Sequence, residues 1–216
     1  MAEKEKISNT GTIIIVTGRT GCGKDFLVDE LEKMALSELG LSRVVTHATR
    51  QPRVGEINHT HYHFCSDLDL NAMHSNNELV ETPVITGSSR KATSKKELLQ
   101  VLEGKHKIWR IDLSLAAKIA SGEYYHNQFD SQTADILASS TVVIYIDVEQ
   151  EILNSRRQSR DKEKYDPNEY AERDAQELDI INLHGHHFST RILNPDGKID
   201  ETKQNLYNLV SEFINN

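Results

Sequence analysis

The spacing of three glycines and one lysine near the N-terminus is the strongest chemical signal in this sequence. The stretch reads Gly18-Arg-Thr-Gly-Cys-Gly-Lys24-Asp25; it follows an apolar run at residues 12–16 and precedes an amphipathic segment. A strand, a glycine-rich turn and a helix form the context in which G-x-x-x-x-G-K indicates a phosphate-binding loop. The glycines let backbone N–H groups surround phosphate oxygens, and the helix N-terminus adds a partial positive charge.

The charged residues at the end of this loop suggest two further roles. We expect Lys24 to reach the terminal phosphates as a point charge. The next position usually carries a Ser or Thr whose hydroxyl binds Mg²⁺, but this chain has Asp25. Hard cations favour oxygen ligands, so Asp25 is a candidate metal ligand. Without a bound metal, its negative charge would repel the phosphates. The predicted phosphate-binding residues are Gly18, Arg19, Thr20, Gly21, Cys22, Gly23, Lys24 and Asp25.

Length and charge exclude several classes of protein. The chain has 216 residues and a formal net charge of −8, which fits one substantial domain or a core with small inserted subdomains. An acidic balance argues against a nucleic-acid or anionic-membrane partner. No apolar run approaches the roughly 20 residues of a membrane span, and no secretory signal is recognisable. We therefore expect a cytoplasmic protein with neither a nucleic-acid nor a membrane partner.

The alternation of short β-branched runs with helical patterns predicts an α/β fold with a parallel sheet flanked by helices. The predicted strands are 12–17, 43–47, 107–112, 141–147 and 188–193. Helix starts are expected at Ser94, where Glu97 completes a capping-box pattern, at Asp166 and at Asp200.

Two regions interrupt the alternation. Residues 48–93 are polar and rich in turn residues, which indicates a small, partly β inserted subdomain. Residues 154–174 are dense in charge, a composition that more often marks a solvated helix face than a site.

A second stretch brings basic residues and a tyrosine together in a specific order. It reads Thr46-His-Ala-Thr-Arg50-Gln-Pro-Arg53-Val-Gly-Glu56 and is followed by Tyr62-His-Phe64. With the loop at Gly18, this stretch resembles the guanylate kinase family, in which T-R-x-P-R-x-G-E and a Y-x-F strand grip the acceptor phosphate. The resemblance continues along most of the chain in the order and near the spacing of the family.

The resemblance implies a fold and an activity. The fold would be of the P-loop NTPase type, and the reaction would transfer the γ-phosphoryl group of ATP, with Mg²⁺, to GMP or dGMP. The protein would act as a monomer or homodimer. The implied parts are a core of residues 1–47, 94–153 and 175–216, a nucleoside-monophosphate subdomain of residues 48–93, and a lid of residues 154–174.

The residues for the acceptor phosphate follow from the second stretch. The guanidinium groups of Arg50 and Arg53 are planar and can each donate two hydrogen bonds to one phosphate, and the hydroxyl of Tyr62 can donate another. In the matching stretch, Glu56 would orient nearby basic groups or the sugar.

The resemblance also assigns residues to the guanine base. Guanine presents N1–H and N2–H₂ donors on one edge and acceptors on another. Glu81 and Asp112 are the implied carboxylates for the donor edge, while Thr46 and Ser88 would read the acceptor edge with their hydroxyls. A helix-capping role is the structural alternative for Asp112.

Three arginines of the charged segment match the family's lid. Arg156, Arg160 and Arg173 would act with Lys24 on the transferring group, because phosphoryl transfer needs charge neutralisation and in-line placement. Their match favours a catalytic role for this segment over a merely solvated face.

Several departures keep other interpretations open. Asp25 replaces the Ser or Thr of the loop motif, and the tyrosine expected after Glu81 is missing. Arg110 stands where many relatives carry an acid, and the connection formed by residues 122–138 is longer than usual in the family. A kinase of another acceptor, a modified nucleotide or ribose bisphosphate, is one alternative. A non-catalytic guanylate-kinase-like binding domain is another, although such domains typically have a damaged phosphate loop.

The alternating histidines His59, His61 and His63 would share one face of a strand. We expect solvated strand histidines rather than a zinc site, since no cysteine or further carboxylate joins them at ligand spacing.

Overall fold

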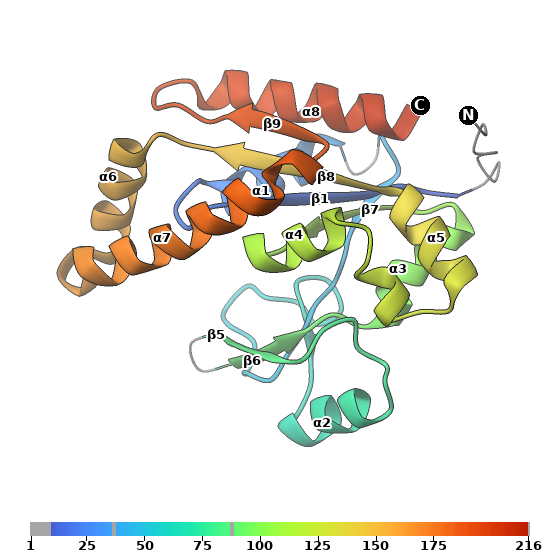
Figure 1. Ribbon diagram of the computed structural model, residues 1–216. Coiled ribbons are helices and arrows are strands. Elements are labelled where there is room, and N and C mark those ends of the chain that lie inside the picture. The colour runs from blue at the N-terminus through green and yellow to red at the C-terminus, as the bar shows by residue number, and fades with distance from the viewer. Residues whose placement is uncertain (1–9, 36–37, 87–88, 216) are drawn as a thin grey trace.

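The computed structural model describes residues 10–35, 38–86 and 89–215. A five-stranded sheet in the order β2-β7-β1-β8-β9 lies at its centre, and every neighbouring pair is parallel (Figure 1). The parallel sheet and flanking helices expected from the sequence are confirmed. The strands are β1 (Ile13–Gly18), β2 (Leu41–Arg43), β7 (His106–Arg110), β8 (Thr141–Asp147) and β9 (Thr190–Leu193).

Helices cover both faces of this sheet because the central strand is apolar on both sides. In β1, Ile14 and Val16 pack with α1 and α8, whereas Ile13 and Ile15 pack with α3, α4 and α5. Successive side chains of a strand point to opposite faces, so one unbroken apolar run serves two helical layers. The helices are α1 (Lys24–Ala35), α3 (Lys95–Leu99), α4 (Leu113–Ala120), α5 (Ser131–Ser139), α6 (Gln150–Asp161), α7 (Pro167–His184) and α8 (Ile199–Asn215).

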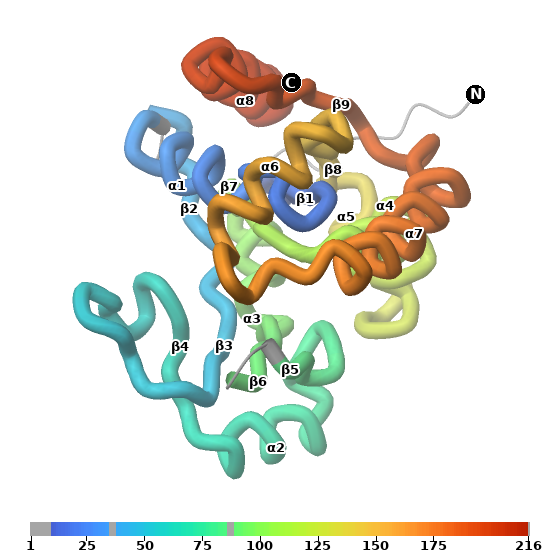
Figure 2. The backbone as a smooth tube through the Cα atoms, turned by 90° about the vertical axis from the view of Figure 1, so that its left-hand side faces the viewer, coloured from blue at the N-terminus to red at the C-terminus, as the bar shows by residue number. Residues whose placement is uncertain are grey.

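A second, smaller sheet with the order β4-β3-β6-β5 lies apart from the first, together with α2 (Figures 1 and 2). Its elements are β3 (His47–Ala48), β4 (His63–Phe64), α2 (Asp67–Ser75), β5 (Val84–Thr86) and β6 (Ser89–Ala92). Short 3₁₀ turns complete the chain at Gln100–Glu103, Tyr125–Asn127, Lys162–Lys164 and Gly185–His187. Within the described ranges, no helix is long and apolar enough to cross a membrane.

The predicted strand 43–47 is wrong, because the chain changes sheets within it. Residues up to Arg43 pair with β7, and His47 pairs in the second sheet. Between them, the backbone N–H of Val45 donates to the Glu97 carboxylate at 3.2 Å instead of to a strand. A side chain from a distant helix therefore ends the strand.

The same glutamate explains why the expected capping box at Ser94 is absent. Ser94 precedes α3 without a side-chain capping bond, because the Glu97 carboxylate accepts from the buried Lys107 ammonium at 3.1 Å. The start at Asp166 is confirmed: its side chain accepts from the Asn168 N–H at 2.8 Å, and Pro167 is the first helical residue.

The expectation of three histidines on one strand face is also wrong. Strand β4 contains only His63 and Phe64, and His59 lies before it with a φ of 63°. His59 and His63 contact each other through their Nδ1 atoms at 2.8 Å, whereas His61 Nδ1 accepts from the Ile57 N–H. No set of three or more metal-ligating side chains occurs in the part of the chain that the structure describes.

A buried carboxylate joins the phosphate loop to α6 and α7. Asp174 of α7 accepts two hydrogen bonds from the fully buried Arg157 of α6, at 2.7 and 2.8 Å. Arg19 of the loop lies 2.8 Å from the same carboxylate. Burial alone would raise the pKa of Asp174, but the hydrogen bonds from Arg157 and Arg19 hold it well below its usual range.

Replacing Asp174 with Asn should destabilise the fold, because two buried guanidinium groups would lose their shared anion. We expect the free energy of unfolding to fall by about 3–5 kcal/mol, measured by urea denaturation. Glu103→Gln breaks an exposed pair with Lys105 and should cost less than about 1 kcal/mol. Equal costs for the two variants would contradict the structural role of Asp174.

Candidate active site

A cavity of about 1020 Å³ lies where the carboxyl ends of β1 and β7 face the second sheet. Its lining joins segments that are far apart in the sequence, from both sheets and from α7. The predicted site residues that line it are Gly18, Thr20, Lys24, Asp25, Thr46, Tyr62, Glu81, Asp112 and Arg173. The structure thus brings residues predicted to bind the donor phosphates and the base, and one predicted for the lid, into one space.

The glycine-rich loop lies between a strand and a helix, which is the context that its motif predicts. It leaves β1 at Gly18 and enters α1 at Lys24, whose ammonium donates to the Gly18 carbonyl at 3.2 Å. Gly23 has a φ of 87°, and a Cβ there would lie 2.9 Å from the Asn194 amide nitrogen. That amide in turn donates to the Cys22 carbonyl at 2.8 Å. Only glycine fits this position, because both the backbone conformation and the close neighbour exclude a side chain.

An unexpected carboxylate lies on the loop. Glu177 of α7 accepts from the Thr20 N–H at 3.1 Å and from the Thr20 hydroxyl at 3.0 Å. Arg173, one turn earlier, lies 3.4 Å from the same carboxylate. Sequence reasoning missed Glu177, because 157 residues separate it from its partner and no local pattern marks it.

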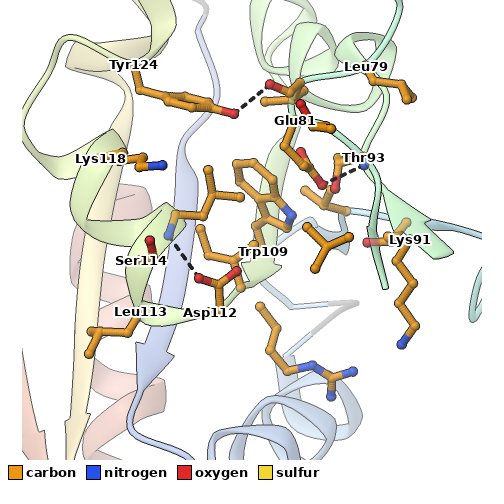
Figure 3. A pocket seen from close by; sticks show the side chains of 18 of the residues that line it. Leu79, Glu81, Lys91, Thr93, Trp109, Asp112, Leu113, Ser114, Lys118 and Tyr124 are labelled. Carbon is orange, nitrogen blue, oxygen red and sulfur yellow. Dashed lines mark hydrogen bonds between the residues drawn. The ribbon is translucent and has the colours of Figure 1, made fainter. Parts of the chain in front are cut away.

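Glu81 lies at the other end of the cavity with one satisfied and one unsatisfied oxygen (Figure 3). Its Oε1 accepts from the Thr93 N–H at 2.8 Å. Its Oε2 is buried and has no hydrogen-bond partner among the described residues. Burial raises the pKa of Glu81 to about 7. A buried acceptor of this kind is costly unless a ligand donates to it.

Asp112 and Thr46 complete the predicted base-binding residues that the structure describes. Asp112 caps α4, because its Oδ1 accepts from the Leu115 N–H at 3.0 Å. It also lines the cavity across from Glu81, with Trp109 between them (Figure 3). The capping and binding interpretations are therefore compatible. Ser88 lies outside the described residues.

The predicted acceptor-phosphate residues divide into two groups. Tyr62 lines the cavity, whereas the described lining residues do not include Arg50, Arg53 or Glu56. The Arg50 guanidinium forms a bidentate pair with Glu56 at 2.5 and 2.6 Å and lies over the Tyr62 ring at 5.1 Å. Glu56 also accepts from the Arg53 backbone N–H at 2.7 Å. Glu56 thus holds a basic group in place, and the Arg53 side chain is exposed.

The three arginines predicted for the lid occupy different surroundings. Only Arg173 is among the described residues that line the cavity. Arg156 reaches the loop from α6, with contacts to the Cys22 carbonyl at 3.5 Å and the Asn194 carbonyl at 3.2 Å. Arg160 pairs with the neighbouring Asp161 at 2.8 Å and is half exposed.

Four cations that sequence reasoning did not assign to the site also line the cavity: Arg43, Lys91, Arg110 and Lys118. Lys91 of β6 donates to the Tyr62 hydroxyl at 3.1 Å. The Nε of Arg110, at the end of β7, lies 3.4 Å from Asp25 Oδ1. Arg110 was noticeable in the sequence as a departure, while nothing in the sequence distinguishes Lys91 from a surface lysine.

Comparisons with known proteins agree with this geometry. The family model described as guanylate kinase matches residues 10–211. The guanylate kinase of Mesoplasma florum is 32% identical over 117 residues, which are 54% of this chain and 39% of that protein. The guanylate kinase of Shewanella frigidimarina is 34% identical over 97 residues, 45% of each chain. The matched stretches thus span less than half the length of these curated relatives.

A crystal structure of guanylate kinase from Anaplasma phagocytophilum has the same fold, with a TM-score of 0.59 and 18% identity. The superposition covers 95% of this chain and 87% of that one. With the family model spanning nearly all of the described residues, the chain belongs to the guanylate kinase family.

Proposed function

We propose that this protein transfers the γ-phosphoryl group of ATP to GMP or dGMP, giving ADP and GDP or dGDP. The observation that carries the proposal is the buried Glu81 Oε2, which has no hydrogen-bond partner in the described parts of the chain and lies in the same cavity as the glycine-rich loop. Family membership supports the same reaction.

The carboxylate end of the cavity suits guanine. The N1–H and N2–H₂ groups of guanine would donate to Glu81 and Asp112, whereas adenine would place an acceptor against these acids. An acceptor opposite a buried carboxylate leaves both groups unpaired, which is costly. On this proposal, the hydroxyls of Thr46 and Ser88 read the opposite edge of the base.

The loop end suits ATP with Mg²⁺. Asp25 is exposed to the cavity, and one carboxylate with phosphate oxygens and waters is a common way to hold this ion. The single carboxylate therefore fits the group, even though the described residues contain no all-protein metal cluster. When bound, the ion would neutralise charge on the donor phosphates. Lys24 would do so from the other side.

The transfer itself needs placement more than covalent chemistry from the protein. An oxygen of the acceptor phosphate attacks the γ-phosphorus in line, and the bond to the β,γ-bridging oxygen breaks as ADP leaves. We propose that residues 154–174 act as a lid, with Arg156, Arg160 and Arg173 neutralising the transferring group and excluding water. Residues 48–93 would hold the acceptor through Arg50, Arg53 and Tyr62.

The two alternatives have less support. The loop keeps its glycines, with Gly23 at a φ of 87°, and Lys24, which supports catalysis over a binding module. The match to the family model favours a nucleotide over a sugar phosphate as acceptor. The cytoplasmic location and the monomeric or homodimeric state stay predictions.

A coupled assay of ADP formation across nucleoside monophosphates tests the proposed acceptor. We expect GMP to exceed AMP and CMP by on the order of a hundredfold or more in kcat/KM, because a hydrogen-bonding site rejects a mismatched edge. Lys24→Met should lower kcat for GMP by about a hundredfold or more.

Lys33→Met, on the exposed side of the same helix, is the matched control and should keep full activity. Greater activity with AMP or CMP than with GMP would refute the assignment of the base site.

The pKa of Glu81 predicts how guanine binding depends on pH. Only the ionised carboxylate accepts both guanine donors, so guanosine affinity should rise as the pH increases to about 7 and then level off. Guanosine is the suitable ligand, because it has no phosphate that titrates near pH 6. Fluorescence of the single tryptophan, Trp109 in the cavity wall, can report binding.

Glu81→Gln should bind guanosine weakly at every pH, whereas Glu78→Gln, at an exposed neighbouring position, should keep the wild-type profile. A wild-type affinity that does not change between pH 5.5 and 8 would count against Glu81 as the guanine-binding acid.

A further inference from the structure

We propose that Lys91 and Arg110, together with Tyr62, bind the phosphate group of the acceptor nucleotide. This inference rests on the proposed function and names the residues that hold the acceptor's dianion. Both cations line the cavity that contains the donor loop and Glu81.

The position of Lys91 suits a phosphate ligand. Lys91 and Thr93 are two residues apart in the chain and both line the cavity, so the segment that holds Glu81 through the Thr93 N–H also supplies the ammonium (Figure 3). The ammonium donates to the Tyr62 hydroxyl at 3.1 Å and lies 4.7 Å from the centre of its ring. An ammonium has three donors, and the bond to Tyr62 uses one of them.

Arg110 reaches the same space from the main sheet. It is the last residue of β7, two positions before Asp112, and its side chain is 27% exposed. Its contacts with Asp25 and Asp29 are 3.4 and 3.6 Å long, which is at or beyond the limit of a hydrogen bond. These acids orient the guanidinium and leave donors for the bidentate contact that arginine makes with phosphate.

The charges of both cations converge on the Tyr62 hydroxyl. Burial raises the pKa of Tyr62, but the hydrogen bond and charge of Lys91, with the charges of Arg110 and Arg50, outweigh burial and lower it. The electrostatic environment at this hydroxyl therefore favours a negative group. A phosphate oxygen bound beside Tyr62 would have the same surroundings.

The acidic residues of the cavity make nearby cations important for binding a phosphate. Four carboxylates line the cavity, and together they would repel a phosphate dianion: Asp25, Glu81, Asp112 and Glu177. Arg50 is predicted to bind the phosphate, but its guanidinium donates two hydrogen bonds to the Glu56 carboxylate.

Among the described cations that line the cavity, Arg43 is paired with Glu32 at 2.5 Å. Lys91 and Arg110 are the two whose charges act on the Tyr62 hydroxyl.

Titration calorimetry with GMP and with guanosine, in the absence of ATP and Mg²⁺, tests the inference. Lys91→Met and Arg110→Met should each weaken GMP binding by about tenfold or more, the loss expected for a hydrogen bond to a charged group. Guanosine binding should change by less than about twofold, because guanosine has no phosphate. In steady state, the KM for GMP should rise.

Arg90→Met is the matched control. Arg90 precedes Lys91 on β6, but its guanidinium donates to Asn71 at 2.8 Å, and it is not among the described lining residues; its GMP affinity should equal that of wild type. Unchanged GMP affinity in the Lys91 and Arg110 variants, or equal losses for GMP and guanosine, would overturn the inference alone. A wild-type protein that binds neither ligand would overturn the proposed acceptor, and the inference with it.

Discussion

The parallel pairing of β1 with β7 is the constraint on which the candidate active site depends. Val16 of β1 pairs with Arg110 of β7, so both strands end at the same edge of the sheet. Two residues later, the backbone after β1 enters the phosphate loop at Gly18, and the backbone after β7 reaches Asp112 at the start of α4. The carboxyl edge of a parallel sheet is where α/β proteins bind ligands. The residues proposed to bind the donor phosphates and the acceptor base thereby line one cavity.

Asp25 and Arg110 both depart from the family pattern, and in the structure they lie next to each other as an ion pair. Asp25 adds a negative charge at the end of the phosphate loop, and Arg110 adds a positive charge at the end of β7. The two side chains lie 3.4 Å apart, so each offsets the other electrostatically. An acid can therefore occupy the proposed metal-binding position without leaving an uncompensated charge beside the proposed site of the donor phosphates.

Local signals explain what the sequence predicted well. The predicted strand 141–147 is β8 itself, and the phosphate loop lies between a strand and a helix as its motif required, because glycine spacing and apolar runs act over a few residues. The failures involve long-range contacts. Glu97 ended one predicted strand by binding Val45 across 52 residues. Glu177 and Lys91 had no recognisable signal, because their partners are brought to them only by the fold. The residues that form the cavity wall were thus harder to predict from the sequence than the residues of the phosphate loop.

The central claim is that one cavity holds the donor phosphates and the acceptor guanine at the same time. Calorimetric binding of a bisubstrate compound, adenosine and guanosine joined through five phosphates, tests this claim most directly. If both sites share the cavity, the compound should bind at least about a hundredfold more tightly than ATP or GMP alone, because the second half binds intramolecularly. An affinity no higher than that of ATP alone would contradict the account.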